Sequence, residues 1–367
     1  MSWELTAADL PDLARGATLL GTGGGGDPYV GQLMVANALG SRSITVLDPD
    51  ELADDLVVIP TAQMGAPTVV IEKMPAGTEP SLALQTLEEY LGVRAGATMP
   101  IECGGINSMI PLLVAAERGL PVVDADGMGR AFPELSMETF AVYGVHGSPL
   151  ALAGERGERV VIDTGDDDRQ MEWLARGVTI RLGGVAHIAE YVMSGADVRR
   201  TAVPRTLSMA LALGRAIRLA REEKRSPFDA IESALAPTLY NKMVTLFEGK
   251  VADVERRTTE GFARGVAKIV ADGPDAAGEL EIRFQNENLL ALRDGELVAI
   301  VPDLICVVER DSAEPITTEG LRYGQRVRVL GISTPDLMRT PEALAAFGPG
   351  AFGLDKSFEP VEVMATR

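Results

Sequence analysis

The alternation of short apolar runs with helical stretches in the first 160 residues most restricts the fold of this chain. The runs "DLVVIP" (55–60), "ATMPIEC" (97–103) and "LPVVDAD" (120–126) are typical of buried strands, and residues 80–91 and 107–118 between them have helical periodicity. Strands that alternate with helices predict an α/β domain with a mostly parallel sheet covered on both faces. In such a sheet, functional loops gather at the carboxyl ends of the strands.

The pattern changes after about residue 160. Residues 205–224, "RTLSMALALGRAIRLAREEK", form the clearest amphipathic helix, and closely spaced strand signals follow between 250 and 332. These signals predict a C-terminal domain rich in antiparallel β-structure, a barrel or sandwich, with helices. We therefore place the α/β domain at residues 1–165 and an α+β domain at 166–367. The Gly- and Phe-rich tail, about 345–367, is expected to pack back on the first domain.

The net charge and the cysteine content limit which classes of binding partner and which compartment we expect. The formal net charge of −19 disfavours nucleic acid and anionic lipid, and no apolar run is long enough for a membrane span. Two cysteines, Cys103 and Cys306, are too few for a disulfide framework or a thiolate zinc site. The N-terminus lacks the hydrophobic region of a signal peptide. We expect a cytoplasmic protein whose partner is a small-molecule substrate.

The stretch "LLGTGGGGDPYVG" (19–31) contains G-x-G-x-x-G at residues 21, 23 and 26, the spacing of a dinucleotide-binding turn. A dinucleotide site requires a strand before this turn, but Leu10, Leu13, Ala17 and Leu20 predict a helix, with Thr6 as its N-cap. Asp48 lies where an acidic ribose ligand is expected, although "DPDEL" is equally a simple helix start. A nucleotide-binding protein remains an alternative, and we predict that NAD and ATP do not bind.

Two neighbouring segments carry the candidate site. Glu102, Gly105 and Asn107 belong to "IECGGINS", where a Gly-Gly turn before a helix can bind an anion or serve only as a tight turn. In "DADGMGRAFPE", Asp124, Asp126, Arg130 and Glu134 follow an apolar strand. A carboxylate can activate water and an arginine can hold a planar polar group, whereas the same residues also suit a structural Asp–Arg pair.

The sequence contains little evidence for a serine nucleophile, a histidine-bound zinc ion or a cysteine nucleophile. G-x-S-x-G is absent, and the two histidines, His146 and His187, exclude a three-histidine zinc site. A divalent metal held by carboxylates or one histidine stays open. Cys103 lies near a predicted helix start, where a thiolate nucleophile would be stabilised, but a buried inert thiol fits as well.

Five segments together resemble the S-methyl-thiohydantoin desulfurase-like family, whose members are associated with hydantoinase-type enzymes. They are "LGTGGGGDPYVG", "MGAPTVVIEKMP", the run from Glu102 to Met137, "FQNENLLA" and "GPGAFGLDKSFEPV". The resemblance covers about residues 8–362, and "DADGMGRAFPE" is its most specific mark. It implies an N-terminal α/β domain, a C-terminal domain, and hydrolysis of an S-methylated thiohydantoin ring with release of methanethiol.

From the motif positions we assign catalysis to Asp124, Asp126, Glu134 and Glu102. The residues expected to bind substrate are Gly23, Gly24, Gly25, Asp27, Gly105, Asn107 and Arg130. The glycine loop is then one wall of the active-site cleft, and Asp124, Asp126, Arg130 and Glu134 should face that cleft. The resemblance also leaves open a non-catalytic subunit of a hydantoinase- or oxoprolinase-type enzyme, and a homo-oligomer.

Overall fold

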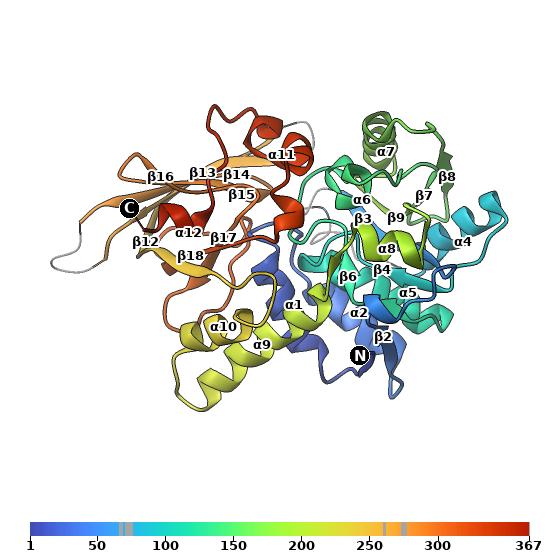
Figure 1. The fold of residues 1–367 in the computed structure, drawn as a ribbon, viewed down its shortest axis with the longest axis horizontal. Helices are drawn as coiled ribbons and strands as arrows, with labels where there is room; N and C mark the ends of the chain where they lie inside the picture. The colour runs from blue at the N-terminus through green and yellow to red at the C-terminus, as the bar shows by residue number, and fades with distance from the viewer. Residues whose placement is uncertain (66–68, 70–75, 260–261, 273–276, 367) are drawn as a thin grey trace.

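The computed structural model describes residues 1–65, 69, 76–259, 262–272 and 277–366, and Figure 1 shows their arrangement around two large β-sheets. Much of the segment "MGAPTVVIEKMP" therefore lies outside the described residues. Within the described part of the chain, no helix has the length and apolar character needed to cross a bilayer.

The first sheet has parallel strands in its middle and antiparallel strands at both sides. Its order is β1 (Trp3–Leu5), β2 (Ile44–Leu47), β5 (Val122–Val123), β4 (Ala97–Met99), β3 (Val57–Gly65), β9 (Val185–Ala189), β7 (Leu150–Ala153) and β8 (Arg159–Ile162), and β10 (Met193–Ser194) also pairs with β3. The pairs β2–β5, β5–β4 and β4–β3 are parallel. The predicted α/β domain is confirmed. Strands β7, β8, β9 and β10, which were not predicted from the sequence, extend the sheet.

Helices cover both faces of this sheet, and the alternating side chains of β3 pack against different helices on the two faces. Ile59 packs with Leu84 of α4 (Glu79–Leu91) and Val114 of α5 (Ile110–Arg118). Ala62 and Met64 point to the opposite face, in the same core as Met171 of α7 (Asp168–Arg181). The carboxyl end of β3 therefore lies between α5 and α7.

The second sheet is antiparallel and curls into a half-barrel, so that β15 contacts β17 (Figure 1). Its order is β16 (Glu296–Ile300), β15 (Glu287–Arg293), β14 (Glu279–Gln285), β13 (Phe262–Val270), β12 (Met243–Thr259), β18 (Arg326–Ile332) and β17 (Leu304–Glu309). Asp294 and Gly295 have φ of 50° and 86°, the left-handed values of a tight hairpin turn between β15 and β16. The predicted antiparallel C-terminal unit is confirmed.

Two helices from distant parts of the chain cross at glycines. In α1 (Leu10–Leu20) a Cβ on Gly16 would overlap the backbone of Ala210, and in α9 (Thr206–Glu222) a Cβ on Gly214 would overlap the backbone of Asp12. The predicted helix before the glycine loop is thus α1, although it begins at Leu10 after Asp9 rather than near Thr6. The crossing places the glycine loop at the junction of the two sheets.

The remaining elements are short, apart from α2 and α10. They are α2 (Tyr29–Leu39), β6 (Ala125–Asp126), α6 (Thr139–Val142), α8 (Gly195–Thr201), β11 (Val203–Pro204), α10 (Pro227–Leu235), α11 (Pro341–Phe347), α12 (Val361–Met364), and the 3-10 turns η1 (Pro49–Glu51), η2 (Gly105–Ser108), η3 (Leu135–Met137), η4 (Asp336–Met338) and η5 (Pro349–Phe352).

The first sheet contains all strands from β1 to β10 except β6, and the second sheet contains β12 to β18. Strands β9 and β10, which follow the predicted boundary at residue 165, belong to the first sheet, and helix α7 packs on that sheet. In the tail, the rings of Phe347 and Phe352 lie 4.8 and 6.4 Å from that of Phe132. Tail and first domain are therefore in contact next to the "DADGMGRAFPE" segment.

Candidate active site

A cavity of about 240 Å³ lies where the glycine loop, the carboxyl end of β3 and the start of β15 meet. Its walls are Gly25, Gly26, Asp27, Tyr29, Val30, Gln63, Met64, Gly65, Ile101, Glu102, Ile106, Asn107, Met128, Phe132, Pro133, Glu134, Leu135, Arg176, Asn286 and Glu287. The lining combines apolar side chains with polar and charged groups, four carboxyl groups among them, and such a mixture can orient a small organic ligand.

Backbone contacts hold the glycine loop in place. The carbonyl of Gly25 accepts from Ile106 N–H at 2.8 Å, and the carbonyl of Gly23 accepts from Thr318 N–H at 2.7 Å. A Cβ on Gly25, where φ is +75°, would lie 2.6 Å from the carbonyl carbon of Gly104. These glycines therefore allow the loop to fit between the "ECGG" turn and the second sheet, and only Gly25, Gly26 and Asp27 of the loop reach the cavity.

Glu102 has one carboxylate oxygen fixed by a hydrogen bond and one free oxygen, and it lines this cavity. Its Oε1 accepts from Asn107 Nδ2 at 2.8 Å, while its buried Oε2 has no hydrogen-bond partner. Burial raises the pKa of Glu102 to about 8. Asn107 is itself fixed, because its Oδ1 accepts from the backbone N–H of Gln63 at 2.8 Å. The free oxygen of Glu102 is thus oriented by a rigid neighbour.

Glu287 brings a second carboxyl group to the cavity from the other sheet. It is buried against Gly24, where a Cβ would overlap its side chain, and its Oε2 has no partner. Burial raises the pKa of Glu287 well above its usual range, and the nearby Glu102 raises it further. Two carboxyl groups with displaced pKa values in one cavity are the arrangement expected of an acid–base pair.

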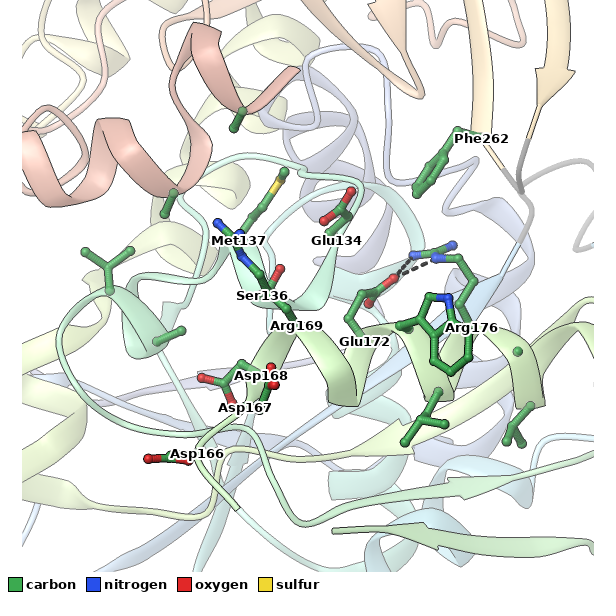
Figure 2. Close-up of a pocket in the computed structure, with 18 of the residues that line it drawn as sticks. Glu134, Ser136, Met137, Asp166, Asp167, Asp168, Arg169, Glu172, Arg176 and Phe262 are labelled. Atoms are coloured by element: carbon green, nitrogen blue, oxygen red, sulfur yellow. Dashed lines mark hydrogen bonds and ion pairs between the residues drawn. The ribbon is translucent and has the colours of Figure 1, made fainter. Parts of the chain in front are cut away.

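Glu134 and Arg176 line both the cavity and a larger groove along α7. Arg176 is held on three sides: its Nε donates to Glu172 Oε1 at 2.6 Å, its Nη2 donates to Pro133 O at 3.0 Å, and its guanidinium lies 4.5 Å from the ring centre of Phe262. Figure 2 shows this ion pair with Phe262 and Glu134 nearby. Glu134 and Arg176 therefore belong to the wall that the cavity and the groove share.

Family models match both parts of the chain. Residues 8–164 match the S-Me-THD-like N-terminal domain, and residues 166–361 match the S-Me-THD-like C-terminal domain. The chain belongs to the S-Me-THD-like family. The resemblance to S-methyl-thiohydantoin desulfurases is therefore confirmed at the level of the family.

The fold of this S-Me-THD-like chain is also that of a solved structure. A crystal structure of a protein from Chromobacterium violaceum, determined by the Northeast Structural Genomics Consortium, is similar with a TM-score of 0.82 and 27% identity. The similarity covers 98% of this chain and 100% of the other. No curated protein sequence matches.

The structure gathers some of the predicted site residues and separates others. Glu102, Asn107, Glu134, Asp27 and Gly25 line the cavity of the S-Me-THD-like chain. Gly23, Gly24 and Gly105 do not line it, because they pack against Asn288, Glu287 and the backbone of Gly25, respectively.

Asp124 and Asp126 do not face the cavity, contrary to the expected shared cleft. Asp124 Oδ1 accepts from Ser208 N–H at 3.0 Å, in the first turn of α9. Asp126 accepts from the backbone N–H groups of Cys103, Met128 and Gly129. Burial raises the pKa of Asp126 to about 6, although these bonds oppose the shift. Both carboxylates hold backbone segments together, so their placement differs from the prediction.

Arg130 does not face the cavity either. Its buried guanidinium donates to four carbonyl oxygens, those of Ala131, Pro302, Asp303 and Asn288, at 3.0–3.1 Å. Burial lowers its pKa to about 10, so it stays charged at neutral pH. Instead of binding a planar ligand, Arg130 binds the second sheet to the first domain.

Sequence reasoning missed Glu287 and Arg176. Glu287 stands in "FQNENLLA" as the first residue of β15, and a carboxyl group directly before the apolar run "LLAL" was an available signal. It also missed Glu138 and Glu190, whose four buried carboxyl oxygens have no partner and whose pKa values burial raises well above the usual range. These two residues do not line the cavity.

Two sequence features bear on a dinucleotide site, the element before the glycine loop and Asp48, and the structure favours such a site at neither of them. Helix α1, and not a strand, precedes the glycine loop. Asp48 caps η1, with its side chain accepting from Asp50 N–H, and forms an ion pair with Arg205 at 2.9 Å. The Asp48 carboxylate is thus engaged by the protein itself.

Neither the histidines nor the cysteines line the cavity. Cys103 and Cys306 are buried, and burial raises the pKa of each thiol. His146 lies 3.1 Å from Asp168 Oδ2 on the surface, and burial lowers the pKa of His187 to about 4. Within the described ranges, no group of three or more His, Cys, Asp or Glu side chains is placed to hold a metal ion.

Proposed function

We propose that this protein is a hydrolase that acts on a small cyclic amide of the S-methyl-thiohydantoin type and releases methanethiol. The observation that carries the proposal is Glu102, with one oxygen fixed by Asn107 and the other unpartnered in the buried wall of the cavity. Membership of the S-Me-THD-like family supports the substrate class.

The pKa order of the two carboxyl groups assigns their roles. In the reactive form Glu102 is ionised and Glu287 is protonated, since both pKa values are raised and the neighbouring Glu102 charge keeps Glu287 neutral. Glu102 is then the general base and Glu287 the general acid. This replaces the assignment of the base to Asp124 or Asp126, whose oxygens are occupied by backbone N–H groups.

The reaction follows as two steps. Water adds across the ring C=N bond at the carbon that carries sulfur, while Glu102 accepts a water proton and Glu287 donates a proton to the ring nitrogen. The carbon–sulfur bond then breaks as the new hydroxyl becomes the hydantoin carbonyl. The proton held by Glu102 leaves with the sulfur as methanethiol, and the hydroxyl proton returns to Glu287. Both carboxyl groups regain their starting state.

The test is methanethiol release from S-methyl-thiohydantoin by the wild type and by Glu102→Gln and Glu287→Gln. Loss of a general base or acid typically lowers the rate about 10²–10⁴-fold, and we expect this loss without a fall in melting temperature. The matched control is Asp124→Asn, a buried carboxylate outside the cavity, which should lower the melting temperature and keep kcat. Full turnover by Glu102→Gln would refute the proposal.

A further inference from the structure

Three apolar side chains of the cavity wall come from the segments next to Glu102. Ile101 precedes Glu102 in the chain, and Met128 and Phe132 belong to the "DADGMGRAFPE" segment. Their exposed fractions are 2%, 1% and 5%. Burial raises the pKa of Glu102, and the backbone N–H of Phe132 is one of the neighbouring groups that oppose this rise, which places Phe132 beside the carboxyl group. These three side chains form an apolar corner of the cavity next to the proposed base.

Hydrogen bonds hold this corner against the segment that carries the base. The N–H of Gly127 donates to Ile101 O at 2.8 Å. The carboxylate of Asp126 accepts from Cys103 N–H at 2.7 Å and from Met128 N–H at 2.8 Å. Asp126 thereby joins the residue that follows the base to a residue of the apolar corner. The distance between the corner and the base is therefore set by buried hydrogen bonds.

The ring of Phe132 is supported by residues that do not line the cavity. The rings of Phe347 and Phe352 lie 4.8 and 6.4 Å from it, and the guanidinium of Arg130 lies 4.9 Å from its centre. Protein interiors are close-packed, so a side chain supported in this way has little room to withdraw. The size of the apolar corner is therefore set by Phe132 and by the tail behind it.

The proposed reaction places the methylthio group of the substrate next to Glu102. Water activated by Glu102 attacks the carbon that carries sulfur, and the sulfur then leaves with the proton that Glu102 has accepted. Such proton transfers require heavy atoms about 2.6–3.2 Å apart, or one water between them. The methylthio group must therefore lie among the side chains that flank Glu102. Burial against apolar side chains favours its methyl group, and its polarisable sulfur interacts favourably with an aromatic ring.

We propose that Ile101, Met128 and Phe132 form the subsite for the departing methylthio group, and that Phe132 limits the size of the S-alkyl group that the protein accepts. The inference rests on the proposed function, because it assumes that Glu102 acts at the carbon that carries sulfur. It gives Phe132 a role in specificity.

The experiment measures kcat/KM for S-methyl-, S-ethyl- and S-propyl-thiohydantoin from the release of the thiol. One added methylene in a closed apolar pocket changes kcat/KM about tenfold or more, so the wild type should prefer S-methyl over S-propyl by at least about tenfold. Phe132→Leu and Phe132→Ala enlarge the corner, and the alanine variant should bring the two values within about threefold. The preference is a ratio within one enzyme, so it does not depend on how much of a variant is folded.

The matched control is Phe247→Leu. Phe247 has the same exposed fraction as Phe132, 5%, and its ring centre lies 5.7 Å from the guanidinium of Arg293, but Phe247 does not line the cavity. This variant should keep the wild-type preference for S-methyl whatever its stability. An equal change of the preference in Phe247→Leu and Phe132→Leu would overturn the inference.

Binding of the S-methyl and S-propyl compounds in the Glu102→Gln background, measured by calorimetry, separates the inference from the proposed function. If the wild type turns over no ring, but the S-methyl compound binds more tightly and an added Phe132→Ala removes this difference, only the proposed chemistry fails. If the wild type turns over all three substrates equally well, or if neither Phe132 variant changes the preference, only the subsite fails. If no ring is turned over and the compounds bind equally or not at all, both are wrong.

Discussion

At the residue scale, the ionisation of Glu102 should raise activity and lower stability as the pH increases. The base must be ionised, so kcat should rise with pH toward a pKa of about 8. In the unfolded chain this carboxyl ionises near 4.5, whereas in the folded protein it stays protonated to about 8. The unfolded state therefore binds fewer protons between these values, and the contribution of Glu102 to the free energy of unfolding falls as pH rises from about 4.5 to 8.

Rate profiles between pH 6 and 9 and melting temperatures between pH 5 and 8 measure the two effects. Burial raises the pKa of Asp126 as well, to about 6, so the comparison is between the wild type and Glu102→Gln. The glutamine variant should lose stability less steeply with pH than the wild type. Equal slopes would show that Glu102 ionises normally in the folded protein.

At the scale of elements, the crossing of α1 and α9 depends on Gly16. A methyl group there would overlap the carbonyl of Ala210, so Gly16→Ala should destabilise the protein by about 1–3 kcal/mol or more, despite the better helix propensity of alanine. Gly177 is the matched control, because it lies inside α7 and a Cβ there meets nothing within 4 Å. Gly177→Ala should stabilise by about 0.5–1 kcal/mol. Denaturant unfolding of both variants decides the point, and a neutral Gly16→Ala would contradict the close crossing.

At the scale of the whole molecule, Arg130 connects the first domain to the second sheet. Arg130→Met would leave the carbonyls of Asn288, Pro302 and Asp303 without this donor. Because a buried acceptor left unpaired costs about 1–3 kcal/mol, we expect a loss of about 3 kcal/mol or more and a broader calorimetric transition as the two parts unfold less cooperatively. Arg181→Met, on the exposed end of α7, should leave the transition unchanged. A sharp transition at the wild-type temperature in Arg130→Met would exclude this connecting role.

The sequence by itself determined the α/β and antiparallel classes of the two parts and the helix before the glycine loop. Such features follow from local periodicity, as in Leu10, Leu13 and Leu20 of α1, and need no knowledge of distant contacts. Strands β9 and β10 escaped prediction because short apolar runs without flanking signals do not distinguish a strand from a buried helix segment.

The site was decided by the tertiary structure. Glu102, Asp124 and Asp126 all follow short apolar runs, so their sequence positions do not distinguish them. Ser208, Met128 and Cys103 N–H groups engage the two aspartates, whereas Asn107 leaves one oxygen of Glu102 free. Glu287 reaches the same cavity from the second sheet. Hydrogen-bond partners and burial, which set the pKa of a carboxyl group, depend on contacts between segments far apart in the chain.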